Sequence, residues 1–319
     1  MNRWSECYTQ NTERYIDSSG NPPRHTFFYP IEQYNEEVVS ALAKLCASTG
    51  CETEIHLHHN EDTPENLHET LIEGKAALSR HRLLSADNSG NVVFGFIHGN
   101  WALANCDPRG INCGVTEEIE ILQQSGCYAD FTMPSAPHPT QPKTINSIYY
   151  STTKTPRPLD NGKVSAVGQS NRQGLLMIQG PLALNWQKRK WGIFPRIENG
   201  SLTGANPPTS KRMRLWEKMN IQVSGQQHWT FIKLYTHGAL PLNQKMLLGQ
   251  PMAEFYHSIS QETLSDKSPK LHYATAREMV NIIHAAEDGM TGNPSDYRDY
   301  RYRSIMTGAA GNSTADRQD

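Results

Sequence analysis

The chain has 319 residues, of which 37% are hydrophobic and 19% are charged, a composition typical of a globular protein with a sizeable core. Thirty basic residues against 32 acidic ones leave a formal net charge of -2, which argues against a nucleic-acid partner. No run of about 18 apolar residues occurs, so neither a spanning helix nor a membrane partner is expected. Because the opening MNRWSECYTQ lacks the apolar stretch of a secretory signal, we expect a cytoplasmic location.

All six cysteines lie within the first 127 residues, at irregular spacing and without a CxxC pair. A zinc ribbon needs such pairs, and a cytosolic protein keeps its thiols reduced. We therefore expect reduced, mostly buried cysteines.

Helix signals appear at several points along the chain. Apolar residues recur at helical spacing over 35–48, and Thr63-Pro64 has a threonine cap followed by proline at the first helical position. Thr116 is expected to cap a helix that ends at Gly126, and Thr275–Glu278 reads as a capping box.

Short apolar segments between these helices are predicted strands. They are Thr26–Pro30, Glu52–His59, Val92–His98, Tyr128–Met133, Leu175–Gln179 and Trp229–His237. Strands that alternate with helices indicate an α/β fold with a largely parallel sheet. Because no glycine-rich dinucleotide fingerprint follows any strand, we favour a distorted, incomplete (β/α) barrel. We assign 1–306 to a single domain with a long loop region at about 131–212, and 307–319 to a disordered tail.

Histidines mark the ends of three predicted strands. Strand alternation puts His56 and His58 on one face of the first, and His59 and Asp62 follow in the loop that leaves it. The other two strands end at His98 and His237. In parallel α/β folds the ligand site lies at the carboxyl ends of the strands, so these histidines are expected to converge there.

Imidazole nitrogen and carboxylate oxygen are ligands of zinc, and a catalytic zinc site keeps one position open for water. His58 with Asp62 or His59 supplies such ligands, and His56 lies beside them. Spacing alone does not fix which atoms bind.

These segments resemble a known family. TFFYP at 26–30 resembles the ATFF strand of the polysaccharide deacetylases, carbohydrate esterase family 4, and EIHLH at 54–58 resembles their metal motif E-I-G-N-H. Segments 92–101 and 231–238 stand where the family has its arginine-proline and leucine-histidine motifs. The likeness covers about residues 24–130 and 229–290.

The resemblance implies a metal-dependent hydrolase that removes acetyl groups from an acetylated sugar or polysaccharide. His58 becomes the first metal ligand, and Asp62 takes the place of the second, with His59 and His56 as substitutes. His237 becomes the general acid. His98, Asn100 and Trp101 end a strand that faces the same site, so we assign them to the substrate.

The main departure from the family is at the start of the chain. The family opens with T-F-D-D-G, which supplies the general base and a metal-ligating aspartate, and no such string precedes Thr26. Either the sequence begins after that strand, or Asp17 or another acid substitutes. If the base is absent, the chain is a catalytically inactive carbohydrate-binding or scaffold protein that keeps the fold.

A different metallohydrolase of the amidohydrolase type is a further alternative, since Lys233 and His237 share a face of the last predicted strand. Several aromatic residues in or near predicted loops are candidates for stacking on sugar rings. They are Trp101, Tyr149, Tyr150, Trp186 and Trp191.

Overall fold

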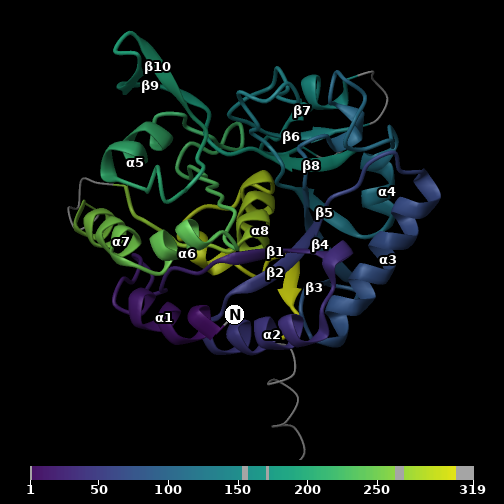
Figure 1. The fold of residues 1–319 in the computed structure, drawn as a ribbon, viewed down its shortest axis with the longest axis horizontal. Coiled ribbons are helices and arrows are strands. Elements are labelled where there is room, and N and C mark those ends of the chain that lie inside the picture. Colours follow the sequence, from purple (N-terminus) through teal and green to yellow (C-terminus); the bar gives the residue numbers. More distant parts are fainter. Residues whose placement is uncertain (1, 153–156, 170–171, 263–268, 307–319) are drawn as a thin grey trace, which may run out of the picture.

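An open and mostly parallel β-sheet forms the centre of the fold (Figure 1). A computed structural model of the chain describes residues 2–152, 157–169, 172–262 and 269–306. Across the sheet the strands are β1 (Thr26–Pro30), β2 (Glu52–Leu57), β4 (Val92–His98), β5 (Cys127–Asp130), β8 (Leu175–Ile178), β6 (Ile148–Ser151) and β7 (Lys163–Val164). The first five are parallel to one another, and β6 is antiparallel to both β8 and β7.

The predicted α/β class with a largely parallel sheet is therefore confirmed. Among the described strands β1 and β7 form the two edges, so the sheet is not closed. Two smaller pairs of strands lie outside this order. β3 (Ser85–Asp87) pairs with the start of β4 and with β11 (Tyr302–Ser304), and β9 (Ala183–Lys190) forms a separate hairpin with β10 (Phe194–Glu198).

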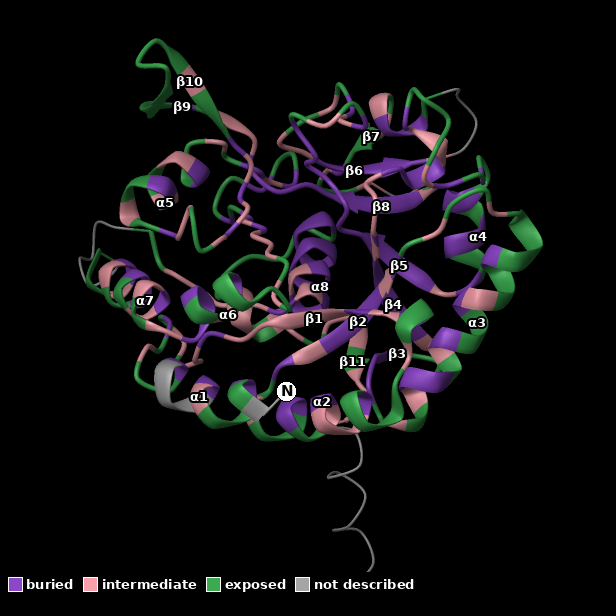
Figure 2. Cartoon of the chain, in the orientation of Figure 1, coloured by how far each residue is buried: buried purple, intermediate pink, exposed green. Residues whose placement is uncertain are grey.

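Helices cover both faces of the sheet. They are α1 (Asn2–Thr12), α2 (Glu36–Thr49), α3 (Pro64–Arg80), α4 (Glu118–Gln124), α5 (Ser210–Glu217), α6 (Pro241–Leu247), α7 (Gln250–Glu262) and α8 (Ala276–Glu287), with 3-10 turns at Ile31–Gln33, Leu103–Asn105, Pro158–Asp160 and Pro294–Tyr297. Strand alternation sends Ile55 and Phe94 into one apolar core with α2, α3 and α4. Val93 and Tyr128 enter a second core with α8. The strands of the central sheet are correspondingly buried in Figure 2.

Local capping explains where several helices begin. The Asn35 side chain accepts the Val38 N–H at α2, the Thr63 hydroxyl accepts the Asn66 N–H at α3, and the capping box at Thr275 is complete. The expectation for Thr116 was wrong, because the cap of α4 is Glu117 and the Thr116 hydroxyl accepts from the Asn105 side chain instead.

The predicted strand at Trp229–His237 is also wrong. Apart from an isolated bridge between Tyr235 and Ser201, this segment has no strand pairing in the described structure. Its backbone is satisfied by loops, since the Phe231 N–H donates to the Ile221 carbonyl (2.8 Å) and the Tyr235 N–H to the Gly200 carbonyl (3.3 Å). The apolar character of the segment reflects the second core, in which Trp229 and Phe231 are buried.

The region 131–212, expected to be a long loop region around the predicted strand at 175–179, also contains β6, β7, β9 and β10. The apolar run of β6 has only four residues, which is too short for a periodic signal. The expected tail at 307–319 lies outside the described residues. The cysteines form no disulfide in this structure, and four of the six are buried, as predicted. None of the helices in the described parts of the chain is long and apolar enough to cross a bilayer.

Candidate metal centre

Four metal-ligating side chains gather beyond the carboxyl ends of β2 and β4. They are His59, His98, Cys113 and Glu118, and one ligand atom from each lies within 4.8 Å of those of the other three. His59 follows β2, His98 ends β4, Cys113 lies in the loop before α4, and Glu118 is the first residue of α4. The parallel sheet places these segments together because the carboxyl ends of neighbouring strands share one edge.

His59 lies between two carboxylates. Its Nδ1 donates to Asp62 (3.0 Å) and its Nε2 faces Glu118 Oε1 (3.1 Å). Burial alone lowers the pKa of His59, but the hydrogen bond and charge of Glu118, together with Asp62, raise it above its ordinary value. Gly114 lets the loop before α4 approach this point, since a Cβ there would lie 2.4 Å from the Asp62 nitrogen.

Glu118 is fully buried and is held in a fixed orientation. Its Oε2 accepts the Ala104 N–H (2.6 Å) and the Cys113 thiol (3.3 Å). Ala104 has a left-handed backbone (φ 52°), which an L-residue adopts at some cost in free energy. Burial raises the pKa of Glu118, but His98 and His59 outweigh it and lower that pKa below its ordinary value.

His98 carries the most informative atom of the cluster. Its backbone N–H donates to the Thr132 hydroxyl (2.9 Å), and its Nδ1 lies 3.2 Å from the Asn100 N–H. Its Nε2 is buried 3.9 Å from Glu118 Oε1 and has no hydrogen-bond partner among the residues that the structure describes. Burial lowers the pKa of His98 to about 4, so the ring is neutral at pH 7. Burying an imidazole nitrogen without a hydrogen-bond partner costs free energy unless that nitrogen binds a ligand.

His56 and His58 stand beside the cluster, with their rings edge-to-face at 4.5 Å. His58 Nδ1 donates to Glu32 (2.7 Å), and His56 Nδ1 donates to the Ile97 carbonyl (2.9 Å). The His58 ring packs where only glycine fits, because a Cβ at Gly99 would lie 2.2 Å from it. Burial lowers the pKa of His56 to about 4.

The remaining predicted residues lie around this edge of the sheet. His237 is exposed, and its charge contributes to the lowered pKa of His56. Asn100 contacts His98 through its backbone, while the Trp101 ring lies 5.3 Å from that of His138. The structure thus brings the strand-end histidines and Asp62 into one neighbourhood, but its four-residue group contains only His59 and His98 of them.

Cys113 and Glu118 were missed from the sequence. The sequence predicts mostly buried thiols, and Cys113 is buried, which raises the pKa of its thiol. For Glu118 a signal was present: in a helix it lies one turn before Ile121 and Leu122, both buried. A carboxylate on the apolar stripe of a helix needs a buried partner.

The hydrogen bonds of Lys233 are to residues outside the four-residue group. Lys233 is buried, and its Nζ donates to the carbonyls of Phe131 and Met133 just beyond β5. Of the aromatic candidates, Tyr149 and Tyr150 are buried in β6, whereas Trp186 and Trp191 are exposed on the β9–β10 hairpin.

The chain was compared with protein-family models, curated proteins and solved structures, and none of the three comparisons gave a significant match.

Proposed function

We propose that the chain is a metal-dependent hydrolase whose cation is bound by His59, His98 and Glu118. The observation that carries the proposal is the buried Nε2 of His98, which faces Glu118 and lacks a partner within the described chain. Two imidazole nitrogens and one carboxylate oxygen are the ligand set of several catalytic zinc sites, in which water takes the fourth position. Zinc is therefore the expected cation.

The surroundings of His59 support this assignment. Asp62 holds the proton of His59 on Nδ1, so that Nε2 faces Glu118 and the other donors. A carboxylate behind a metal-binding histidine fixes the tautomer and raises the basicity of the ligand. For His98 to bind through Nε2, its Nδ1 must carry the proton and so must lose its contact with the Asn100 N–H.

The substrate assignment rests on the resemblance to polysaccharide deacetylases. That family uses two histidines and an aspartate from an opening strand that this sequence lacks before Thr26. In our proposal Glu118 replaces that aspartate, and the open parallel sheet corresponds to an incomplete deacetylase barrel. The expected substrate is an acetylated sugar or polysaccharide, which Trp101 and Asn100 would contact beside His98.

A bound zinc ion would polarise the acyl oxygen and lower the pKa of a water molecule. Two histidines are candidates for the proton transfers of the reaction. Because the Ile97 carbonyl can only accept, His56 Nδ1 carries a proton and His56 Nε2 is free to accept one. The exposed His237 remains the candidate that protonates the leaving group.

One observation favours a second candidate function. Cys113 Sγ belongs to the same four-atom group, and a fourth protein ligand would close the coordination sphere. A closed site stabilises a fold but activates no water. The chain would then be a carbohydrate-binding or scaffold protein with a structural zinc ion.

Zinc titration of purified variants, together with acetate release from acetylated oligosaccharides, tests the proposal. We expect the wild-type chain to bind one zinc ion and His98→Ala and Glu118→Gln to bind it at least about 100-fold more weakly, since changes behind the ligands already cost 10–100-fold. His68→Ala, on the exposed surface of α3, is the matched control and should bind normally.

Cys113→Ser separates the two candidates. Retained zinc affinity and acetate release support the hydrolase, whereas lost affinity in a chain that releases no acetate supports the structural centre. Absence of zinc binding by the wild-type chain contradicts both.

A further inference from the structure

Most residues of the hairpin of β9 and β10 are exposed. It leaves the body of the molecule beyond the carboxyl end of β8 and extends into solvent (Figure 1). Nearly all of its ribbon is exposed in Figure 2. A two-stranded hairpin gains little stability by itself, so its side chains are expected to serve another purpose.

Large apolar side chains occupy this hairpin without being covered. At its tip Trp191 is 78% exposed, Ile193 67% and Phe194 59%. Leu184, Trp186 and Ile197 are exposed nearer the body. Single exposed apolar residues are common on protein surfaces, but six on one projecting element indicate an interaction surface.

The same element concentrates positive charge. Lys188, Arg189, Lys190 and Arg196 are all exposed, and Lys190 lies 4.6 Å above the Trp191 ring. The one acidic residue in 183–198 is Glu198, which is buried against Arg212. Because the whole chain has a formal net charge of -2, these cations stand out from an otherwise acidic molecule.

The stem of the hairpin is firmly attached, so the exposure of its tip does not result from loose packing. Arg212 donates to both oxygens of Glu198 (2.8 and 2.7 Å), and the Trp216 indole N–H also donates to Glu198 (3.0 Å). Just before the start of β9, Asn146 exchanges two hydrogen bonds with the backbone of Leu182 (2.7 and 2.9 Å). The fold therefore holds the tip away from the core.

We infer that this hairpin docks the protein on an anionic lipid surface. An apolar tip that contains tryptophan enters the headgroup region, and adjacent lysines and arginines attract the lipid phosphates. Sugar stacking would use Trp186 and Trp191 but would leave Ile193 and Phe194 in water. The inference departs from the expectation of no membrane partner, which rested on the lack of a spanning segment, and it does not depend on the proposed function.

Co-sedimentation of the full chain with vesicles tests the inference. We expect binding to phosphatidylcholine vesicles that contain phosphatidylglycerol, weaker binding in high salt, and little binding to phosphatidylcholine alone. Replacing Lys188, Arg189 and Lys190 by Gln should lower the partition coefficient about 100-fold. Replacing Trp191, Ile193 and Phe194 by Ser should lower it at least about tenfold.

A double change of Leu240 and Leu242 to Ser is the matched control, because both leucines are exposed elsewhere on the surface. It should bind vesicles like the wild-type chain. Circular dichroism of each variant establishes that it is folded. Equal binding to neutral and anionic vesicles, or none to either, overturns the inference. Two further outcomes also overturn the inference. They are self-association without lipid, or binding to polygalacturonate, if the hairpin substitutions abolish it. The hairpin would then bind a second copy of the chain or an acidic polysaccharide.

Discussion

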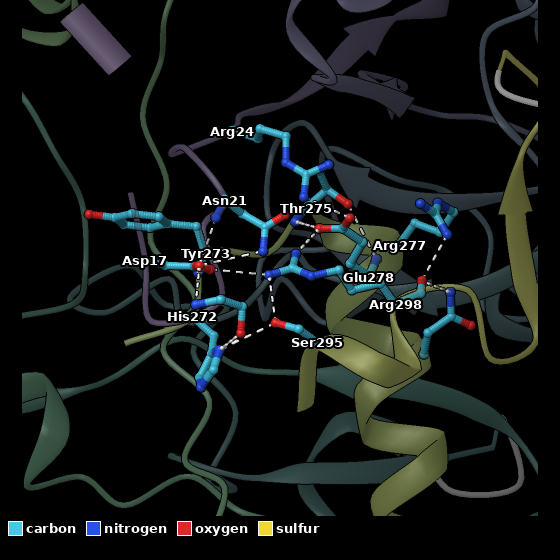
Figure 3. A network of polar contacts seen from close by, with 12 residues as sticks. Asp17, Asn21, Arg24, His272, Tyr273, Thr275, Arg277, Glu278, Ser295 and Arg298 are labelled. Atoms are coloured by element: carbon cyan, nitrogen blue, oxygen red, sulfur yellow. Dashed lines mark hydrogen bonds and ion pairs between the residues drawn. The ribbon is translucent and has the colours of Figure 1, made fainter. Parts of the chain in front are cut away.

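The amino and carboxyl ends of the parallel strands, here called the amino edge and the carboxyl edge of the sheet, carry polar clusters of different chemical character. At the amino edge, around the start of β1, β2 and α8, the buried charges are arginines paired with carboxylates (Figure 3). Arg277 bonds Glu52 through Nε and Nη2 (2.9 and 2.6 Å) and Asp299 through Nη1 (2.5 Å). Arg298 pairs with both Glu278 and Asp17.

At the carboxyl edge, histidines and a thiol surround the single carboxylate of Glu118. The group contains no arginine or lysine, and Glu118 accepts instead from the Ala104 N–H and the Cys113 thiol. Arg24 and Arg298 each pair with the Glu278 carboxylate, although the Nε atom of each has no hydrogen-bond partner among the described residues. His98 Nε2 also has no hydrogen-bond partner there, and its ring has no second donor nitrogen facing a carboxylate. Both edges contain buried ionisable side chains, so the types of side chain distinguish a structural network from a ligand set.

The largest expected effect is at the amino edge. Arg277→Ala leaves Glu52 without its buried partner and should lower the free energy of unfolding by about 3–5 kcal/mol, measured by urea denaturation. Zinc affinity of the folded fraction should not change. Arg303→Ala, at an exposed position, is the control and should cost less than about 0.5 kcal/mol. Lost zinc binding in folded Arg277→Ala would show that the edges are coupled.

Glu54 lies on β2 between the edges and accepts from the Gly95 N–H (2.5 Å) and the Tyr128 hydroxyl, two neutral donors. Burial raises its pKa to about 8. Between its ordinary pKa of 4.5 and about 8, the unfolded chain has lost this proton and the folded chain keeps it. Stability should therefore fall as the pH rises, with a slope of up to about 1.4 kcal/mol per pH unit from this group.

Glu54→Gln removes the ionisable group and should flatten that slope in urea denaturation across pH 5 to 8. Glu65→Gln, on the exposed start of α3, is the matched control and should leave the slope unchanged. An unchanged slope in Glu54→Gln would show that the carboxyl is ionised when buried and that the neutral donors at this point are sufficient.

The smallest expected effect concerns the capping box of α8. Thr275→Ala removes the side-chain acceptor for the Glu278 N–H and should cost about 1 kcal/mol of stability. Thr275→Ser keeps the hydroxyl and should cost much less. Thermal unfolding measures both. A loss beyond about 3 kcal/mol in Thr275→Ala would mean that the contact of Thr275 with Glu52 supports the whole amino-edge network.

Local signals in the sequence were sufficient for much of the fold. The caps at Thr63 and Thr275 set the starts of α3 and α8, and apolar runs gave β1 and β4 at their observed bounds. These features depend on residues within a few positions of one another. The sequence also placed histidines at or just after the ends of β2 and β4. We expected them to lie close together because the carboxyl ends of parallel strands meet at one edge of the sheet.

Tertiary structure decided the rest. The 229–237 segment has strand-like alternation, but loops rather than strands satisfy its backbone. Glu118 lies beside His59 and His98, and it accepts the Ala104 N–H from the turn at Leu103–Asn105, a contact between residues 14 positions apart in the sequence. The sequence by itself thus determined that histidines end or follow β2 and β4, whereas the third predicted histidine-bearing segment, which ends at His237, is not a strand. Packing of the loops beyond those ends determined which atoms meet, since that depends on long-range contacts that no local periodicity encodes.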